Sequence, residues 1–300
     1  MADARSGSGL ETGRAFRAGL VQMTSGPDFG PNLEAADRLI RQAVDAGATF
    51  VATPENTPIL QPDHVQLRAA VPTEETHPAL QAFGALAREL GVWLLLGSTA
   101  VRVDDADAPG GDGRLANRSL LFDDRGRIAA RYDKIHMFDV DVPDGQTYRE
   151  SNAFRPGGQA VLADTAWARL GLTVCYDVRF PALYRALAQA GASVLTVPAA
   201  FTQVTGRAHW HTLLRARAIE TGCYVLAPAQ VGEHAQGRRT YGHTLAVAPW
   251  GEVIADAGDD GPGVVTVDVD PAAVQQARGW VPSLQHDRPF EVVAPTPVPS

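Results

Sequence analysis

The stretch GLTVCYDVRFP, residues 171–181, runs from a short apolar strand into a polar turn and places a cysteine where the two meet. Asp177 and Arg179 follow that cysteine within four positions, whereas a structural cysteine is usually surrounded by apolar residues. A helical pattern begins directly afterwards, at 182–192, so the stretch predicts a strand, an elbow and a helix. The position of Cys175 therefore indicates chemistry on an α/β fold.

Strand and helix patterns alternate on both sides of this elbow. The N-terminal part shows strand patterns at 16–23, 49–56 and 92–100, helix patterns at 31–48 and 77–91, and a hairpin at 115–136 that turns at 124–126. The C-terminal part shows a helix at 208–222 and strands at 193–198, 223–230, 241–255 and 264–270. Strands crowd together in the last third, which predicts a mixed sheet layered by helices.

Composition and charge narrow the class of protein. The 300 residues are 45% hydrophobic and 20% charged, as in a globular protein, and the net charge of -8 comes without a basic run. We therefore expect no nucleic-acid partner. Two cysteines do not make a disulfide framework and the N-terminus has no apolar segment, so we expect a cytoplasmic protein without a membrane anchor. No linker divides the chain, so we expect loose tails at 1–15 and 291–300 and one domain at 16–290.

Three reactive residues follow predicted strands at distant points of the chain. Glu55 ends the strand at 49–56, Lys134 closes the hairpin, and Cys175 follows the strand at the elbow. Strand ends line the crevice where α/β sheets bind ligands, so the three side chains could converge there. Each residue alone has an ordinary explanation, as a buried thiol, a solvated carboxylate or a surface ammonium.

The segments that hold these residues, TPEN (53–56), YDKIHMFDV (132–140) and GLTVCYDVRFP, together resemble the nitrilase superfamily of carbon–nitrogen hydrolases over residues 16–290. The resemblance implies a four-layer αββα sandwich, with Glu55 as general base, Lys134 as electrostatic stabiliser and Cys175 as nucleophile. It also implies that no metal or organic cofactor is used. The segment YRESNAFRPG (148–157) adds Glu150 as a supporting acidic residue, for which the alternative is a surface turn.

This set of residues suits amide hydrolysis. A thiolate can attack an amide carbon once a base takes the thiol proton, and Glu55 would be that base. The negative charge that develops on the carbonyl oxygen needs donors, which Lys134 and the backbone N–H of Tyr176 could supply. Tyr176 follows the nucleophile where aromatic and aliphatic nitrilases typically have Trp, which favours an amidase over a nitrile hydrolase.

The closer resemblance is to the Nit branch, which includes the deaminated glutathione amidases, and it implies a peptide-like α-keto acid amide as substrate. Arg179 could bind a substrate carboxylate, or it could instead form a salt bridge with Asp177 or with a carboxylate on a helix. Tyr176, Phe201 and Thr202 are the other expected substrate-binding residues, and residues 60–77 and 139–150 the expected rim. Ala182 stands where many relatives have Glu, which leaves substrate contacts near that helix open.

Several alternatives stay open. The substrate could be α-ketoglutaramate, as in the ω-amidase branch, or an N-carbamoyl amino acid or a nitrile, and the fold could also serve a non-enzymatic interaction protein. A zinc site could be built from His209, His211, Cys223, His234 and His243. However, H-x-H on a helix directs its two rings to different faces, so we expect no metal. Family members commonly pair, and the helix at 208–221 with the extended C-terminus is the expected homodimer contact.

Overall fold

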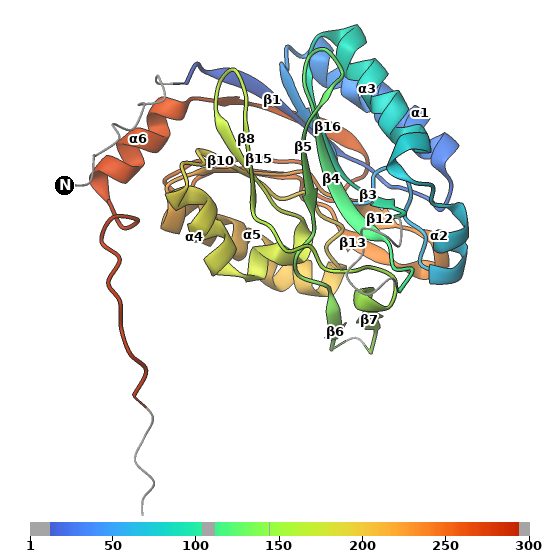
Figure 1. Cartoon of the computed structure of the whole chain (residues 1–300). Helices are drawn as coiled ribbons and strands as arrows, with labels where there is room; N and C mark the ends of the chain where they lie inside the picture. Colours follow the sequence, from blue (N-terminus) through green and yellow to red (C-terminus); the bar gives the residue numbers. More distant parts are fainter. Residues whose placement is uncertain (1–12, 104–111, 144, 294–300) are drawn as a thin grey trace, which may run out of the picture.

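Two six-stranded sheets form the centre of the computed structural model, which describes residues 13–103, 112–143 and 145–293 (Figure 1). The first sheet has the order β16-β1-β2-β3-β4-β5. Its strands are β1 (Phe16–Gln22), β2 (Phe50–Ala52), β3 (Trp93–Val101), β4 (Ala116–Phe122), β5 (Ile128–Asp133) and β16 (Gly263–Val269). The second has the order β15-β14-β11-β10-β9-β8. Its strands are β8 (Val161–Asp164), β9 (Arg169–Leu172), β10 (Val194–Thr196), β11 (Tyr224–Ala227), β14 (Leu245–Val247) and β15 (Val253–Asp256).

Both sheets are mixed, in the same way. Strands β1, β2 and β3 are parallel, as are β9, β10 and β11, and antiparallel strands extend each group on both sides. The carboxyl ends of three parallel strands therefore meet at one edge of each sheet, which is where reactive side chains gather in such folds.

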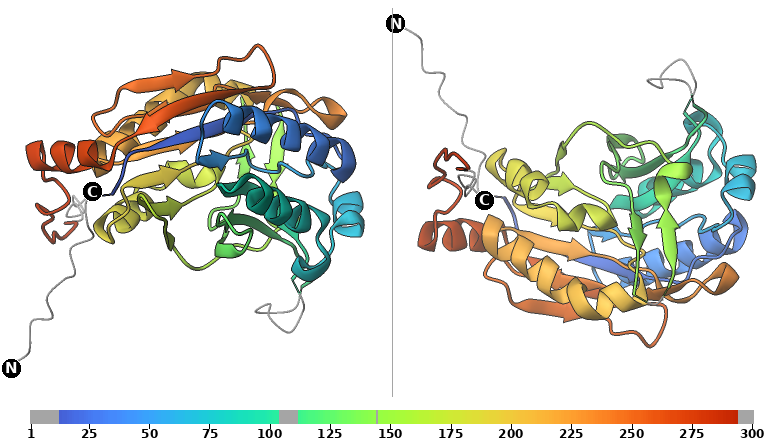
Figure 2. Two further views of the ribbon diagram at one scale, coloured as in Figure 1. Left: turned by 90° about the horizontal axis from the view of Figure 1, so that it is seen from above. Right: turned by 90° about the horizontal axis from the view of Figure 1, so that it is seen from below.

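Helices cover the outer face of each sheet. Helices α1 (Phe29–Asp45) and α3 (Pro78–Leu90) pack on the first sheet. Helices α4 (Pro181–Gln189) and α5 (Gln203–Thr221) pack on the second and lie side by side (Figure 2). Apolar side chains of both sheets, among them Leu95 and Leu172, fill the space between them in one buried cluster. The predicted four-layer αββα sandwich is confirmed.

Helices α2 (His64–Ala70) and α6 (Pro271–Trp280) were not predicted from the sequence. Neither were the short ribbons β6 (Asp139–Asp141) with β7 (Thr147–Arg149) and β12 (Val231–Glu233) with β13 (Arg239–Tyr241). The elbow becomes one of the 3-10 helices, which span Glu74–Thr76, Glu150–Asn152, Cys175–Arg179 and Ala235–Gly237. The single strand expected at 241–255 is wrong: β14 and β15 form a hairpin there because the chain turns at Gly251, with φ of 97°.

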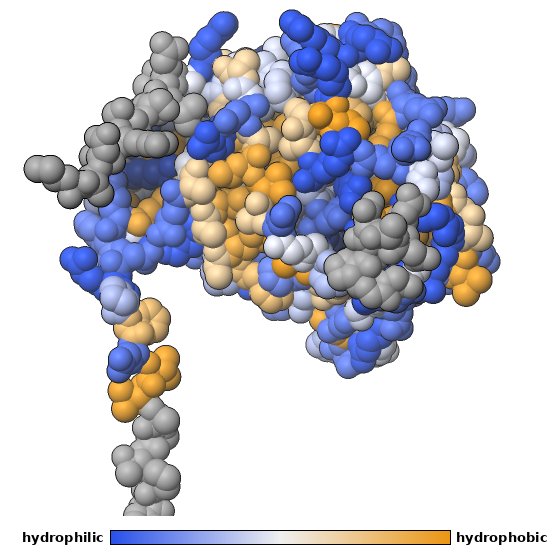
Figure 3. All heavy atoms as spheres, in the orientation of Figure 1, coloured by the Kyte–Doolittle hydropathy of each residue, from blue (hydrophilic) through white to orange (hydrophobic). Residues whose placement is uncertain are grey.

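The face in Figure 3 is largely polar, with an apolar area over β8, between β5 and α4. Among the described residues, no helix has both the length and the apolar character needed to cross a membrane. Most residues of the two predicted tails lie outside the described ranges, and the single domain at 16–290 stays a prediction.

Candidate active site

The four residues predicted for catalysis line one cavity of about 560 Å³. Glu55 lies three residues beyond β2, Lys134 directly follows β5, and Cys175 begins the 3-10 helix after β9. Glu150 follows β7 and reaches the same cavity from the ribbon that covers it. Residues separated by up to 120 positions thus converge where the sheet ends meet.

Lys134 is the centre of this cluster. Its Nζ lies 2.9 Å from Oε1 of Glu55, and 3.0 Å and 2.8 Å from the two carboxylate oxygens of Glu150. The side chains of Lys134 and Glu55 are 2% and 4% exposed, and that of Glu150 is 13% exposed. One buried ammonium is therefore shared by two carboxylates.

Lys134 is also the only lysine in the printed sequence, where the remaining 25 of the 26 Lys and Arg residues are arginines. Lysine is a compact charge with three donors, whereas the planar guanidinium of arginine suits exposed and bidentate pairs. The use of lysine at this one position, in a chain that otherwise uses arginine, therefore indicates that position 134 has a special role. The count of lysines was available from the sequence, and the prediction of Lys134 was made without it.

Asn117, on β4, joins the same cluster and was missed. Its Nδ2 donates to Oε1 of Glu55 at 3.0 Å and to Oε1 of Glu150 at 3.2 Å. Its backbone carbonyl accepts the N–H of Lys134 at 2.9 Å. Its side-chain oxygen is buried without a hydrogen-bond partner among the described residues. Asn117 is one of three successive polar residues in β4, with Arg118 and Ser119, so the sequence alone did not distinguish it.

Glu55 is held by a third donor on its other oxygen. The backbone N–H of Ala200 donates to Oε2 at 2.9 Å, and Ala200 belongs to the segment that follows β10. The carboxylate is thus bound to both sheets at once, through Asn117 and Lys134 on one side and Ala200 on the other. Its position relative to Cys175 is fixed by the packing of the two sheets.

Cys175 has a left-handed backbone, with φ of 50°, which costs a residue other than glycine about 1–2 kcal/mol. Its N–H donates to the carbonyl of Pro198 at 2.9 Å, and the side chain is buried. This strained elbow turns the chain from β9 into the 3-10 helix, so the thiol faces the cavity. Strain of this kind gathers at functional sites.

Asp177 is fully buried and fixes the elbow to the strand that carries Lys134. Its Oδ2 accepts from Oη of Tyr132 at 2.7 Å and from the N–H of Val174 at 2.8 Å. Its Oδ1 lies 2.7 Å from Nδ1 of His136 and accepts the N–H of the same residue at 3.1 Å. Tyr132 and His136 flank Lys134 in sequence, so Asp177 sets the position of the thiol relative to the ammonium.

The alternative of an Arg179–Asp177 salt bridge is wrong, because Asp177 has those other partners. The guanidinium of Arg179 lies 5.8 Å from the ring centre of Tyr176 and 5.2 Å from that of Phe201, and its Nη1 is 3.3 Å from Nδ1 of His209. Burial lowers the pKa of Arg179, which nonetheless stays charged.

The electrostatics of the cluster leave the thiol protonated at rest. Burial raises the pKa of Cys175 well above 9.0 and the negative charge of Glu55 raises it further, and the nearby Lys134 does not offset them. Burial also raises the pKa of Glu55, but the charge and hydrogen bond of Lys134 outweigh it, so the net pKa is lowered. Burial lowers the pKa of Lys134, but the charges of Glu150 and Glu55 raise it well above 10.5. The resting site is an ionised Glu55 beside a neutral thiol.

The cavity wall includes three of the four predicted substrate-binding residues: Tyr176, Phe201 and Thr202. Arg179 is not among the residues that line it. The predicted rim contributes residues 60–62, 64, 67 and 146–150 to the lining, and a third segment, 236–238, was missed. That segment contributes Arg238.

Arg238 donates from Nη2 to the carbonyl of Ala200 at 3.1 Å, and its guanidinium lies 5.8 Å from the ring centre of Tyr148. Its Nε is buried and has no hydrogen-bond partner in the described ranges. The charge of Arg238 also helps to lower the pKa of Glu55. The cavity wall therefore includes a cation close enough to the catalytic candidates to act on Glu55.

The structure separates most residues of the alternative zinc site, which were His209, His211, Cys223, His234 and His243. His209 contacts Arg179, and His234 is buried against Oγ1 of Thr240 at 2.7 Å. Cys223 is buried against the carbonyl of Ala192. The five residues do not form one cluster within the described chain.

Known proteins resemble this chain in both sequence and fold. The carbon–nitrogen hydrolase family model matches residues 17–279. A deaminated glutathione amidase of Yersinia enterocolitica is 43% identical over 270 residues, which cover 90% of this chain and 92% of that protein. The NitFhit protein of C. elegans superimposes with a TM-score of 0.83 at 34% identity, covering 93% of this chain and 66% of that one.

A mutant of the amidase from Nesterenkonia sp. AN1, solved after Michael addition of acrylamide at its active-site cysteine, superimposes with a TM-score of 0.71 at 28% identity. The match covers 89% of this chain and all of that one. The family model spans far more than half of the sequence. This chain belongs to the carbon–nitrogen hydrolase family.

Proposed function

We propose that this chain is an amidase that hydrolyses deaminated glutathione through a thioester on Cys175. The observation that carries the proposal is the buried cluster of Cys175, Glu55 and Lys134 on the wall of a cavity of about 560 Å³, a volume suited to a small organic molecule. The name of the Yersinia enterocolitica relative supports the choice of substrate.

In the first half-reaction, Sγ of Cys175 attacks the amide carbon while the thiol proton passes to Glu55. An ionised carboxylate beside a neutral thiol is the protonation state that this step needs. The tetrahedral intermediate collapses when the C–N bond breaks, and Glu55 returns the proton to the departing amine. The acyl group remains on sulfur as a thioester.

In the second half-reaction, Glu55 takes a proton from water, whose oxygen attacks the thioester carbon. The C–S bond breaks, the thiolate recovers the proton, and the carboxylic acid product leaves. These steps balance without a metal or an organic cofactor. Lys134 and the backbone N–H of Tyr176 stabilise the oxyanion in both halves, since the first N–H groups of a helix have no acceptor within it.

Glu150 acts through Lys134. Its two oxygens lie 3.0 Å and 2.8 Å from Nζ, and its Oε2 accepts the N–H of Phe138 at 2.7 Å. It therefore keeps the ammonium charged and fixed in place. This is a supporting role, which the sequence resemblance also implied.

Deaminated glutathione has a carboxylate on its α-keto acid end and another on its glycine end. We assign one of these carboxylates to Arg238, because its side chain lines the cavity and a guanidinium binds carboxylates with two parallel hydrogen bonds. Arg179 orients the rings of Tyr176 and Phe201 from behind the wall. Phe201 and Thr202 contact the substrate from the start of α5.

The function is tested by measuring product release from deaminated glutathione, α-ketoglutaramate, an N-carbamoyl amino acid and a nitrile, with wild type and Cys175→Ala. We expect the first compound to be hydrolysed fastest and the variant to be inactive on all four. Faster turnover of another compound would reassign the substrate and keep the chemistry. Inactivity of the wild type across the panel would favour the non-enzymatic alternative.

The carboxylate assignment is tested by comparing Arg238→Leu with Arg179→Leu. A charge-assisted contact contributes about 1.5–3 kcal/mol, so we expect Arg238→Leu to raise KM for deaminated glutathione about 10- to 100-fold. For Arg179→Leu we expect a change mainly in kcat, because Arg179 does not line the cavity itself but contacts the rings of Tyr176 and Phe201, which do. The reverse pattern would return the carboxylate to Arg179.

We propose a homodimer as the working assembly. Exposed apolar side chains at the end of α5, in the β14–β15 turn and at the end of α6 support this: Ile219, Trp250 and Trp280 are 55%, 51% and 60% exposed. The rings of Trp250 and Trp280 contact each other at 5.1 Å. Light scattering at micromolar concentration should give twice the monomer mass, and a monomer would refute the assignment.

We also propose that the protein works in the cytoplasm. Cys175 and Cys223 are both unpaired and buried, and the chemistry needs the thiol of Cys175 in its reduced form. Cell fractionation with a compartment marker tests this. Recovery in an oxidising compartment would contradict it.

A further inference from the structure

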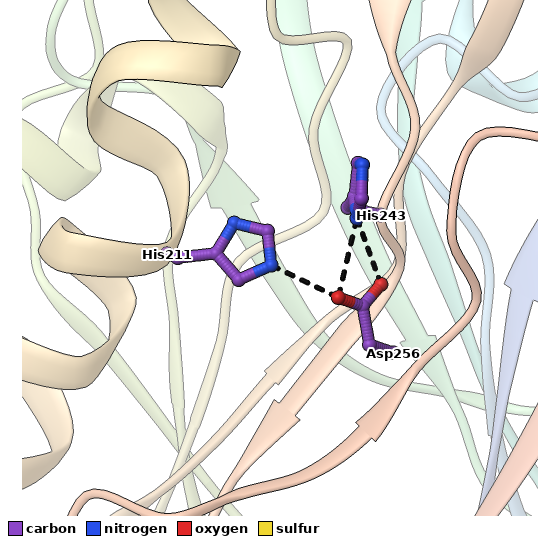
Figure 4. Close-up of side chains that lie close together, drawn as sticks. All are labelled: His211, His243 and Asp256. Carbon is purple, nitrogen blue, oxygen red and sulfur yellow. Dashed lines mark hydrogen bonds and ion pairs between the residues drawn. The ribbon is translucent and has the colours of Figure 1, made fainter.

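Three side chains from separate elements meet on the side of α5 that faces the β14–β15 hairpin (Figure 4). His211 lies on α5, His243 in the turn between β13 and β14, and Asp256 at the end of β15. One ligand atom from each, two ring nitrogens and a carboxylate oxygen, all lie within 4.8 Å of one another. Figure 4 shows both rings directed at the carboxylate. None of the three lines the catalytic cavity.

The donor set is that of a zinc site with an open position. Imidazole suits zinc and its neighbours in the periodic table, and sites with two histidines and one carboxylate complete their coordination with water. Partial exposure supports access for an ion and its water, since the side chains of His211, His243 and Asp256 are 35%, 20% and 30% exposed.

The distances are close to those that a metal requires. Nε2 of His211 lies 2.9 Å from Oδ2 of Asp256, and Nδ1 of His243 lies 2.9 Å from Oδ1. Tetrahedral ligands at about 2.0–2.1 Å from zinc lie about 3.4 Å apart. The ring nitrogens therefore need to withdraw from the carboxylate by about half an ångström. The two rings, whose ligand atoms lie within 4.8 Å of each other, need to close to about 3.4 Å, and rotation of the side chains can supply both shifts. The ion would then replace the two protons that now join the rings to the carboxylate.

The backbone conformation of His243 fixes the position of its ring beside Asp256. His243 has a left-handed φ of 53°, which places its ring over Asp256 and is unusual for a residue other than glycine. Its N–H donates to the carbonyl of Gly258 at 2.8 Å, and its own carbonyl accepts from Nε1 of the buried Trp210 at 2.8 Å. The ring of Tyr241 stacks on it with 4.3 Å between centres.

Asp256 is prepared as a ligand in the same way. Its Oδ1 accepts the N–H of Gly258 at 2.9 Å, so the turn after β15 orients the carboxylate. Both of its oxygens also lie within hydrogen-bond distance of Nδ1 of His243, Oδ1 at 2.9 Å and Oδ2 at 3.2 Å. Outer contacts that fix ring and carboxylate orientation are typical of built metal sites.

We propose that His211, His243 and Asp256 bind one divalent transition-metal ion of the zinc class, with water in the remaining position. Such an ion joins α5 to the β14–β15 hairpin. Its role is structural, because the cavity that holds Cys175 is lined by other residues. The site uses two histidines from the set considered in the sequence analysis together with a carboxylate that was not considered.

The test uses the full-length chain with any affinity tag removed, in a Cys175→Ser background, so that the reactive thiol cannot bind the ion. Calorimetry with Zn²⁺ should give one ion per chain with micromolar or tighter affinity, and Co²⁺ should show the visible absorption of a tetrahedral site. Zn²⁺ at about 100 times its Kd should raise Tm by about 5 °C.

Asp256→Asn and His243→Ala should each weaken Zn²⁺ binding at least about 10-fold. His209→Ala is the matched control, since His209 lies on the same helix two residues from His211 and its ring contacts Arg179 instead. It should bind Zn²⁺ as the parent does. His211→Gln gives a third ligand variant if His243→Ala fails to fold, which circular dichroism and Tm would reveal.

Absence of stoichiometric Zn²⁺ binding would overturn the proposal and leave the three residues as a hydrogen-bonded network. Binding that is unchanged in Asp256→Asn and in His211→Gln would also overturn it, because the ion would then lie elsewhere. Both results are read from metal binding, so they are independent of whether the chain hydrolyses deaminated glutathione.

Discussion

Replacing Lys134 with Met removes the charge at the centre of the buried cluster and keeps a side chain of similar length. Glu55, at 4% exposure and 2.9 Å from Nζ, then becomes a buried carboxylate without a counter-ion. Breaking a buried pair by removing one partner costs about 3–5 kcal/mol, so we expect the free energy of unfolding to fall by that amount at neutral pH. Arg149→Met, which breaks a surface pair with Asp141, is the control and should change it little.

The pH dependence follows from the pKa of Glu55. In the wild type its folded-state pKa lies below the ordinary value of 4.5, so the stabilisation is present above that value and is lost as pH falls through the lowered pKa. Lys134→Met removes the charge and the hydrogen bond that lower this pKa most, so burial outweighs what Arg238 still contributes and the folded-state pKa rises above the ordinary value. The variant is then destabilised at pH values above its raised pKa and recovers as pH falls through it. The difference between the two proteins should shrink from about pH 8 to about pH 5.

Urea unfolding at several pH values, followed by both fluorescence and circular dichroism, measures this difference. Lys134→Met/Glu55→Gln should recover more stability than Lys134→Met/Glu150→Gln, since Glu55 is more buried than Glu150. A loss that does not vary with pH, or equal recovery in the two double variants, would refute the view that an uncompensated Glu55 causes the destabilisation.

Three further predictions concern the same site. A chain labelled with ¹⁵N-lysine should give one Nζ signal, because the sequence has one lysine, and it should stay in the ammonium form beyond pH 10.5; titration below that value would contradict the raised pKa of Lys134. The rate of Cys175 alkylation by iodoacetamide should keep rising with pH through pH 9.0, because burial raises the pKa of the thiol above that value. Cys175→Ser is the blank, and a rate that levels off near neutral pH would mean a resting thiolate. Asp177→Asn should lower stability by about 2–3 kcal/mol and lower kcat more than it raises KM, because Asp177 positions the thiol; an effect confined to KM would argue against that role.

The sandwich could be predicted because its strands and long helices carry strong local patterns. Helix α1 shows its buried face in Leu39 and Ile40, and β3 begins with four successive apolar residues, 93–96. The missed elements are short or lack a pattern. The ribbons β6–β7 and β12–β13 have three residues per strand, and their pairing depends on the chain that surrounds them.

The convergence of Glu55 and Cys175 could be predicted because both reactive side chains follow strands and stand in segments that resemble a known family. Site residues were missed where the role depends on the other sheet or on a ribbon. Asn117 looks like a polar interruption of β4 until its amide is seen between two carboxylates. Arg238 is one of many arginines until the fold turns residues 236–238 into the cavity wall. Sequence spacing carries no information about such contacts, because they arise when the two sheets pack.

The single lysine connects the choice of residue with the chemistry. Arginine would offer a planar fork that pairs with one carboxylate face to face, and its guanidinium is bulkier than an ammonium. The position of Lys134 instead requires one small charge that contacts Glu55 and Glu150 from different directions. An ammonium also has three donors, so a carbonyl oxygen can take the place of one of the two Glu150 oxygens when substrate binds. The site therefore depends on a compact cation with donors in three directions, and the single lysine of this arginine-rich chain stands at that buried position.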